Sequence, residues 1–381
     1  MPRDGFDVSV QAQWGRNFDV RPLYWVISGI FVVLTIFPLI RSARWWVRAA
    51  DFPRLQIATA LASLLASYIL FIDINDLWDV LYLIFMVPAL GLQLVRIFPY
   101  TMIAPNQVRK TSSYRRADSI KVMISNVLME NRRATDLLQV VREVDPDLLL
   151  VVETDDWWHQ KLVPLDELFP YRIKRPQDNY YGMELFSKFE LEADDVRFLL
   201  SDKIPSIRTG VLLPSGVWIE FFGVHPRPPD PDHDSEGRDG ELLLVAKEMR
   251  RSKRAAIVAG DLNDVAWSHT TRLFQRMSGA LDPRRGRGMF NSFHAGHQLL
   301  RWPLDHIFHD TSFTLVELRR LPNIGSDHFP VFAELQYEPS AEAKQDAPKA
   351  DHEDREEAAE MIQEAREGGA DKNLGSPTYE L

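Results

Sequence analysis

The sequence predicts an α/β domain with two packed sheets and helices outside them, preceded by three transmembrane helices. Three apolar runs fall within the first 100 residues. From residue 118 to residue 337, runs with the period of a strand alternate with runs that have the period of a helix, which suits two packed sheets covered by helices. Short polar motifs close or follow the strand-like runs, and strand ends of this kind meet at a common edge where ligands bind.

The three apolar runs have the length of membrane-spanning helices. Residues 23–40 and 55–72 are uncharged runs of 18 residues each, and a third run covers about 78–98, with Asp79 near its start. About 20 apolar residues cross the hydrocarbon layer, and Trp, Tyr and Arg border these runs as they border membrane spans. Three such runs so close together argue against the alternative of buried core helices. We therefore expect residues 1–100 to be a membrane anchor with the lipid bilayer as its partner, and we infer no obligate protein partner.

The basic residues of the loops predict the orientation of the anchor. Residues 41–54 carry four Arg, whereas residues 73–79 carry three Asp and neither Lys nor Arg. Five more basic residues follow Val95, namely Arg96 near the end of the third run and four others up to residue 116. The positive-inside rule then places the following domain in the cytoplasm, on a multi-pass protein of a bacterial inner membrane. Arg3, Arg16 and Arg21 on the opposite side count against this orientation.

Composition excludes several kinds of site and partner. The chain has no Cys, so disulfides, thiolate nucleophiles and Cys-ligated zinc are excluded. The net charge is -10, but residues 338–381 hold 13 acidic and 5 basic residues, which leaves 41 acidic and 39 basic residues before them. A body so close to neutral has no strong general attraction for nucleic acid. We expect 338–381 to be a disordered acidic tail with a possible helix near 352–367, and 101–117 to be a linker.

Between the linker and the tail, apolar periodicity places the elements of the α/β domain, residues 118–337. Strands are expected at 120–125, 148–152, 218–224, 255–259 and 329–336. Helices are expected from residue 131 to Pro146, which would stop the helix, and over 238–251. The polar residues that these elements bring together are Asn126, Glu153, His225, Asp261, Asn263, Asp305, Asp327 and His328. Two His, several carboxylates and two Asn side chains suit a hard cation and a phosphate.

The segment Gly260-Asp261-Leu262-Asn263 is the sharpest single motif. Gly260 permits a tight turn at the strand end, and Asp261 and Asn263 can point the same way in extended geometry. A carboxylate there can orient or deprotonate water, and the Asn amide can donate to a phosphate oxygen. An ordinary Asx turn is the alternative, which the accompanying motifs disfavour.

Glu153 and His225 each follow an apolar strand. An unpaired carboxylate at such a position is costly unless it meets a cation, and Mg²⁺ prefers one or two carboxylates with water, so Glu153 is the best first ligand. An exposed helix-capping Glu is the alternative. The Pro-rich residues 226–229 stiffen the chain after His225, which favours catalysis or phosphate contact over a structural role for this imidazole.

Asp305, rather than its neighbour His306, is expected to enter the site. The two residues lie in a strand, so their side chains face opposite sides. His328 would need a carboxylate to fix its tautomer, and Asp305 can supply it. His306 is then a surface or packing residue. Asp327 and His328 follow a Gly-Ser turn that can present both side chains.

Taken together and in this order, the Gly-Asp-Leu-Asn and Ser-Asp-His motifs resemble the endonuclease/exonuclease/phosphatase superfamily, here of a membrane-anchored bacterial type. That superfamily includes deoxyribonucleases, repair enzymes of the exonuclease III type, inositol phosphatases and sphingomyelinases. The resemblance covers residues 118–337. It implies a four-layer α/β sandwich, a divalent metal (Mg²⁺ or Mn²⁺), and a phosphoester hydrolase of nuclease or phospholipid/inositol phosphoesterase type. The substrate would be a lipid headgroup, a nucleic acid or a small phosphodiester.

The same resemblance implies a role for each matching residue around the metal and the attacking water. Asn126 and Glu153 would hold the metal and its waters. Asp261 would activate or orient the attacking water, and Asn263 would bind the phosphate.

The remaining roles concern the phosphate and the two imidazoles. His225 would contact the phosphate or assist the leaving group. Asp305 would orient His328, which would stabilise the pentacovalent charge or share the acid–base work, and Asp327 would complete the metal or His environment. The repair nucleases usually carry a polar residue where this chain has Leu128, which does not favour DNA as the substrate. A non-catalytic membrane scaffold with a degenerate domain is the alternative function, although every catalytic position is present.

Overall fold

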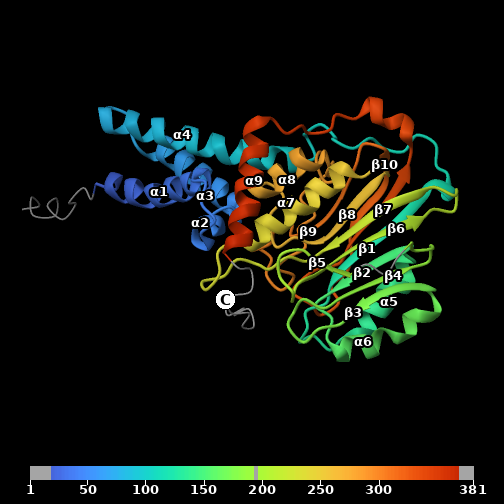
Figure 1. Ribbon diagram of the computed structural model, residues 1–381. Helices are drawn as coiled ribbons and strands as arrows, with labels where there is room; N and C mark the ends of the chain where they lie inside the picture. The colour runs from blue at the N-terminus through green and yellow to red at the C-terminus, as the bar shows by residue number, and fades with distance from the viewer. Residues whose placement is uncertain (1–18, 193–195, 369–381) are drawn as a thin grey trace, which may run out of the picture.

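The computed structural model describes residues 19–192 and 196–368. The chain forms a bundle of helices, called the anchor below, that is joined to an α/β body with two sheets (Figure 1). The anchor consists of the three long helices α1 (Arg21–Ile36), α3 (Arg54–Phe71) and α4 (Leu77–Ile97), which extend together from one end of the body. Each of them, with its flanking turn, is long and apolar enough to cross a membrane. Arg3 and Arg16, which count against the predicted orientation, lie outside the described residues.

The anchor helices pack on one another through a small core of their own. Leu61, Tyr68 and Tyr82 are buried in that core. The outward side chains remain exposed and apolar, such as Leu70 at 74% and Val95 at 69%. A large exposed apolar surface of this kind marks a protein or membrane interface. The anchor is therefore compatible with the three predicted membrane spans.

The body contains two mixed sheets. The first has the strand order β10-β11-β1-β2-β4-β3 and the second the order β5-β6-β7-β8-β9. The strands of the first sheet are β1 (Ser119–Asn126), β2 (Leu148–Val152), β3 (Tyr171–Arg175), β4 (Met183–Ser187), β10 (Phe313–Arg320) and β11 (Val331–Tyr337). Those of the second are β5 (Val196–Phe198), β6 (Pro205–Leu212), β7 (Trp218–Val224), β8 (Ala256–Asp261) and β9 (Asp305–His309). The pairs β1–β2 and β7–β8 are parallel, and the other neighbours are antiparallel.

Helices cover the outer face of each sheet and complete four layers (Figure 1). On the first sheet lie α5 (Ala134–Val144) and α6 (Asp156–Leu162). On the second lie α7 (Glu236–Arg251), α8 (His269–Ser278) and α9 (His352–Glu367). The short helices are η2 (Phe37–Leu39), α2 (Trp45–Ala49), η3 (Phe98–Tyr100), η4 (Arg116–Asp118), η5 (Val163–Glu167) and η6 (Pro339–Lys344). The inward residues of both sheets form one apolar core, which confirms the predicted sandwich.

Two segments at the base of the anchor hold it on the body. The turn after α2 is bonded by Trp267, whose Nε1 donates to the carbonyl oxygen of Asp51 over 2.7 Å. After the third span, the Tyr100 hydroxyl donates to the carbonyl oxygen of Ala266, also over 2.7 Å. Both contacts reach adjacent residues of the body, Ala266 and Trp267. The loop between the first two spans and the end of the third span therefore lie together at the body.

Residues 101–117, which the composition predicts to be a linker, lie against the body. The side chain of Val108 is fully buried in the core between the sheets. The backbone N–H of Thr111 donates to the carbonyl oxygen of Leu315 over 3.0 Å. These contacts give the anchor a defined position on the body.

The acidic segment after Tyr337 differs from the disordered tail that its composition predicts. It forms η6 and then α9, whose range agrees with the possible helix near 352–367. Ala358 and Ile362 of α9 are buried against α7 and α8, and Asp354 accepts two hydrogen bonds from Arg276, each 2.8 Å long. The buried apolar side chains of α9 are Ala, with a single Ile. Such a short apolar stripe does not stand out in an acidic composition, so the composition does not predict that this helix packs on the body. The end of the predicted tail, 369–381, lies outside the described residues.

Candidate active site

Strand ends from both sheets bring the polar residues to one edge of the sandwich. Asn126 ends β1, and Glu153 follows its parallel neighbour β2. His225 follows β7, which is parallel to β8, and Asp261 ends β8. Asp305 begins the antiparallel strand β9 and is paired in register with Asp261. The two parallel pairs thus deliver residues to the same edge, as the sequence predicts.

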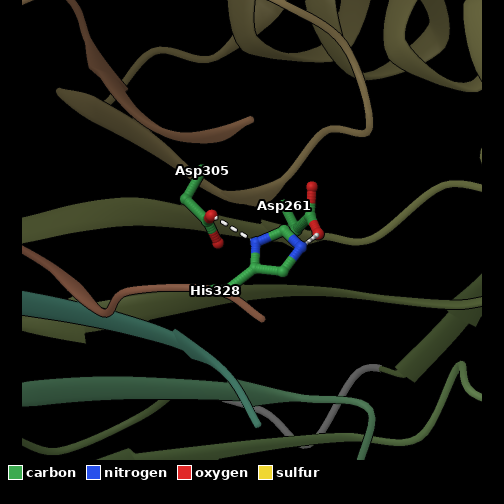
Figure 2. A group of neighbouring side chains, drawn as sticks. All are labelled: Asp261, Asp305 and His328. Carbon is green, nitrogen blue, oxygen red and sulfur yellow. Dashed lines mark hydrogen bonds and ion pairs between the residues drawn. The ribbon is translucent and has the colours of Figure 1, made fainter. Parts of the chain in front are cut away.

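The imidazole of His328 lies between two buried carboxylates (Figure 2). Its Nδ1 is 2.7 Å from Asp305 Oδ2, and its Nε2 is 3.5 Å from Asp261 Oδ2. Burial disfavours the imidazolium, but the charges of Asp305 and Asp261 outweigh burial and raise the pKa of His328 well above its ordinary value. The predicted pairing of Asp305 with His328 is present in the structure.

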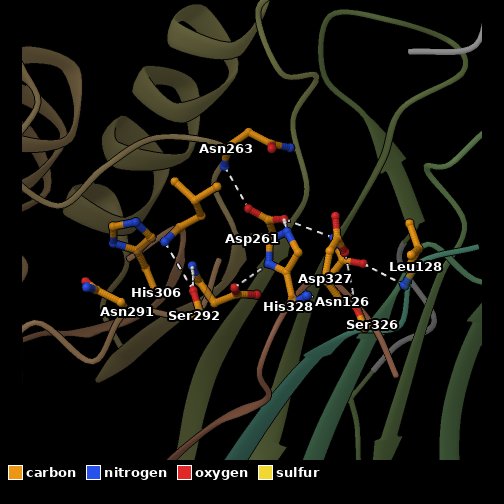
Figure 3. A network of polar contacts seen from close by, with 12 residues as sticks. Asn126, Leu128, Asp261, Asn263, Asn291, Ser292, His306, Ser326, Asp327 and His328 are labelled. Carbon is orange, nitrogen blue, oxygen red and sulfur yellow. Dashed lines mark hydrogen bonds and ion pairs between the residues drawn. The ribbon is translucent and has the colours of Figure 1, made fainter. Parts of the chain in front are cut away.

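Asn126, at the end of the first sheet, joins the carboxylates of Glu153 and Asp261, and Figure 3 shows its contact with Asp261. Its Nδ2 donates to Glu153 Oε1 over 2.6 Å and to Asp261 Oδ2 over 3.0 Å. Its Oδ1 accepts from the N–H of Leu128 over 3.0 Å, so the amide orientation is held from both ends. Glu153 also accepts from the N–H of Met129 over 3.3 Å. Asn126 therefore fixes the spacing between the first sheet and the second at this edge.

His225 faces the same group of carboxylates. Its Nε2 lies 4.0 Å from Glu153 Oε1 and 3.9 Å from Asp261 Oδ2. Within the described part of the chain neither ring nitrogen has a hydrogen-bond partner, and burial lowers the pKa of His225 to about 4. A neutral imidazole has one N–H donor and one acceptor. Both are left free for a ligand.

Asn263 lies in a turn, so the extended geometry predicted for Asp261 and Asn263 is wrong. The backbone of Asn263 is left-handed, with φ of 51°. Its N–H donates to Asp261 Oδ1 over 2.9 Å, which forms an Asx turn, and its Nδ2 donates to the carbonyl oxygen of Pro226 over 3.0 Å. Such turns are common after Asp because the side chain can accept from the backbone two residues later. The turn nevertheless leaves Asn263 on the wall of the cavity described next.

A cavity of about 450 Å³ opens onto this group. Glu153, Asn263, Asp327 and His328 line one part of it. The remaining wall is largely apolar and includes Leu128. Ligand sites commonly combine such an apolar wall with a few convergent polar groups.

Comparison with known proteins identifies the family. A model described as the endonuclease/exonuclease/phosphatase family matches residues 123–328, which is more than half of the chain. The chain belongs to the endonuclease/exonuclease/phosphatase family. No curated protein matches it.

Several solved structures are similar to this family member. D. rerio TDP2 in complex with a single-strand DNA product has 15% identity and a TM-score of 0.49, covering 57% of this chain and 99% of that one. The catalytic domain of human nocturnin with a bound sulfate has 17% identity and a TM-score of 0.48, covering 59% and 96%. A mannosyl-6-phosphatase of Bacteroides thetaiotaomicron has 19% identity and a TM-score of 0.43, covering 57% and 100%.

Enzymes of the family hydrolyse phosphoesters and typically use a divalent metal, and two sets of side chains could hold one. Asp261, Asp305 and His328 each offer a ligand atom within 4.8 Å of the others. An ion at the Nδ1 of His328 would have to replace its hydrogen bond to Asp305. Of the two ring nitrogens of His328, only Nε2, which lies 3.5 Å from Asp261 Oδ2, could bind an ion without breaking that hydrogen bond.

Glu153 lies at the centre of the other set, which the sequence predicts to be Asn126, Glu153 and Asp327. Asp327 is half-buried and lines the cavity with Glu153. Burial, followed by the charge of Asp327, raises the pKa of Glu153 to about 8. Negative charge collected in this way is what a hard cation with oxygen ligands would neutralise. The carboxylates of Glu153 and Asp327 therefore fit a divalent metal, and Asn126 would have to turn its amide to offer Oδ1, because its Nδ2 faces Glu153.

His306 lies outside the group. It is fully buried rather than at the surface. Its Nδ1 is 2.5 Å from Arg284 Nη2, and its Nε2 is 2.8 Å from the carbonyl oxygen of Asp264. It is thus a packing residue with both ring nitrogens bonded.

The sequence does not predict two residues that position the Asp305–His328 pair. The hydroxyl of Ser292 accepts from the backbone N–H of Asp305 over 3.1 Å. The ring of Phe293 packs 4.9 Å from that of His328, measured between centroids. Both residues come from the long segment 279–304, which has no apolar period. A Ser-Phe pair shortly before the Leu-Asp-His motif is the only signal that the sequence offers.

Proposed function

We propose that this chain is a membrane-anchored, divalent-metal-dependent phosphoesterase in which Asp261 orients the attacking water. The observation that carries the proposal is the position of Asp261. One oxygen of its carboxylate, Oδ2, accepts from Asn126 and also lies 3.5 Å from His328 Nε2. One carboxylate therefore belongs to both the predicted metal end and the imidazole end of the site. That position suits an in-line attack, in which nucleophile and phosphorus must be held together.

The hydrolysis begins at Asp261 and ends with two products. Water gives a proton to Asp261, its oxygen forms a bond to phosphorus, and the bond from phosphorus to the leaving alcohol oxygen breaks. The leaving oxygen takes a proton from solvent and Asp261 returns its proton to solvent, so that the products are an alcohol and a phosphate with one ester bond fewer. Bound at Glu153 and Asn126, Mg²⁺ or Mn²⁺ would supply charge neutralisation at the phosphate oxygens.

The two imidazoles have different tasks in this proposal. Asp305 holds the Nδ1 proton of His328, so the protonated Nε2 can face the charge that builds on the phosphoryl oxygens. His225 is neutral, and its unpartnered N–H can donate to a phosphoryl or leaving oxygen. Asn263, on the cavity wall, would bind the phosphate. These tasks account for every catalytic residue predicted from the sequence.

The proposal is tested on the full chain in a phosphate-free detergent, with bis-p-nitrophenyl phosphate and Mg²⁺. Asp261→Asn should lower kcat about 100-fold or more, as loss of a general base does, and chelation of the metal should abolish the activity. Asp310→Asn is the matched control, because Asp310 follows the opposite end of β9 and accepts from the N–H of Ala256. It should retain activity. Hydrolysis that survives Asp261→Asn, or that does not need the metal, would refute the proposal.

A further inference from the structure

We propose that the substrate is a lipid phosphoester, whose phosphate lies at the polar end of the cavity and whose alkyl chain lies along a wall built by the membrane anchor. The proposal rests on the phosphoesterase function proposed above and names its substrate class. The observation that carries it is that one continuous cavity is lined both by the site residues and by the segment between the first two spans.

The cavity has two chemically different ends. The polar end contains Glu153, Asp327 and His328. From there the lining is aromatic, aliphatic and Pro, and the rings of Phe293, Trp302 and Phe52 lead in succession from His328 to the other, apolar end. A phosphate with its metal can occupy the first end, whereas only an apolar group gains from the second, at roughly 25 cal/mol for each Å² removed from water. The shape therefore suits an amphiphile.

The anchor itself supplies part of the apolar wall. Trp45 belongs to α2, and Phe52 lies just before the second span begins at Arg54. The N–H of Trp45 donates to Asp234 Oδ1 over 2.8 Å, and the ring of Phe52 meets that of Trp302 edge-on at 5.7 Å. These contacts fix the wall on the body. The cavity is thus complete only with the anchor in place.

One residue of the cavity wall, Leu300, lies next to a residue that is bonded to the start of the second predicted span. Gln56, in the first turn of α3, donates from Nε2 to the carbonyl oxygen of Leu299 over 2.6 Å. Leu299 is 84% exposed and Leu300 46% exposed. Two adjacent exposed Leu side chains beside a span are unfavourable in water and favourable in lipid. A lipid in the bilayer would therefore reach the cavity through this loop without crossing water.

The lining of the cavity does not favour a nucleic acid. Among the described residues that line it there is neither Lys nor Arg. A polynucleotide brings a charged phosphate with every nucleotide, and proteins that bind it neutralise several of them with basic side chains. A lipid headgroup brings a single reacting phosphoester next to an apolar tail. The lack of basic side chains and the apolar wall therefore both favour a lipid over a nucleic acid as the substrate.

The test compares chain lengths on the full chain in a phosphate-free detergent with Mg²⁺. Phosphatidylglycerol, phosphatidylinositol and phosphatidic acid are each offered with dioleoyl and with dibutyryl chains, beside bis-p-nitrophenyl phosphate and a single-stranded oligonucleotide. We expect at least one dioleoyl lipid to have a higher kcat/KM than its dibutyryl form. Leu300→Ser should lower that chain-length preference by about 10-fold, the size of effect that a few methylene contacts have in an apolar pocket.

Leu168→Ser is the matched control, because Leu168 lies after η5, is 43% exposed, much as Leu300 is, and does not line the cavity. It should keep the chain-length preference of the unchanged protein. Three results would overturn the lipid assignment alone, provided that bis-p-nitrophenyl phosphate is hydrolysed. They are no preference for dioleoyl chains, a preference that Leu300→Ser leaves intact, and the oligonucleotide as the best substrate. Failure to hydrolyse any of these phosphoesters would overturn the phosphoesterase function and the lipid assignment together.

Discussion

At the level of single residues, the charge state of His328 follows from the carboxylates on either side of its ring. A buried imidazole is ordinarily neutral, as His225 is in the same site. His328 differs because Asp305 and Asp261 face its two nitrogens, and their charges raise its pKa. Two histidines in one site are thereby held in opposite protonation states. That separation lets one carry charge and the other act as a neutral hydrogen-bonding group.

Asp305→Asn tests this separation. Without the carboxylate the pKa of His328 should fall, because burial still disfavours the charged form. Activity that needs protonated His328 is lost as the pH rises through its pKa, so the alkaline loss of kcat should move to lower pH, and kcat should drop roughly 100-fold at neutral pH. The measurement is the pH profile of kcat for bis-p-nitrophenyl phosphate. An unchanged alkaline limb would contradict the assigned charge state.

At the level of elements, strand ends were predictable from the sequence and the loop-built wall was not. Asn126, Glu153 and Asp261 each close an apolar strand, and the edge at which parallel strands end is set by topology. Phe52 and Trp302 reach the cavity from loops, whose paths depend on tertiary contacts that leave no period in the sequence. The Asx turn at Asn263, the alternative that the sequence allows, leaves this residue on the cavity wall.

The packing of helix α9 is likewise not predictable from its sequence, because it depends on tertiary contacts. Its packing on α7 can be tested at two glycines of α7. A methyl group placed on Gly240 would overlap the Cβ of Ala365 on α9, whereas one placed on Gly237 meets nothing within 4 Å. Gly240→Ala should therefore lower the free energy of unfolding by about 1–3 kcal/mol, as overpacking does.

Gly237→Ala on the same helix is the control. It should be neutral or stabilising by up to about 1 kcal/mol, because Ala loses less backbone entropy than Gly in a helix. The measurement is the shift of Tm of each variant in the same detergent. Equal shifts for the two variants would show that α9 does not pack against Gly240.

At the level of the whole molecule, the proposed function makes one unit of the anchor and the body. The base of the anchor is bonded to the body through Trp267 and Tyr100, and the turn that Trp267 holds leads into the cavity wall. The same contacts place residues 41–54, which carry four Arg, at the end of the anchor that faces the body. This grouping underlies the predicted cytoplasmic orientation, which follows from the positive-inside rule.

The orientation is tested by reporters joined after Leu381. A fluorescent protein that folds only in the cytoplasm should be bright, and an alkaline phosphatase that is active only outside it should be silent. The same two reporters joined within the loop of residues 73–79 should give the reverse pattern. An active phosphatase after Leu381 would place the body on the outer face.

The central claim is that water, oriented by Asp261 with a divalent metal, attacks phosphorus. Hydrolysis of bis-p-nitrophenyl phosphate by the full chain in ¹⁸O-labelled water measures this directly. We expect the label in the p-nitrophenyl phosphate product and none in the released nitrophenol, with no reaction after the metal is chelated. Label in the nitrophenol, or hydrolysis that continues without the metal, would contradict the claim.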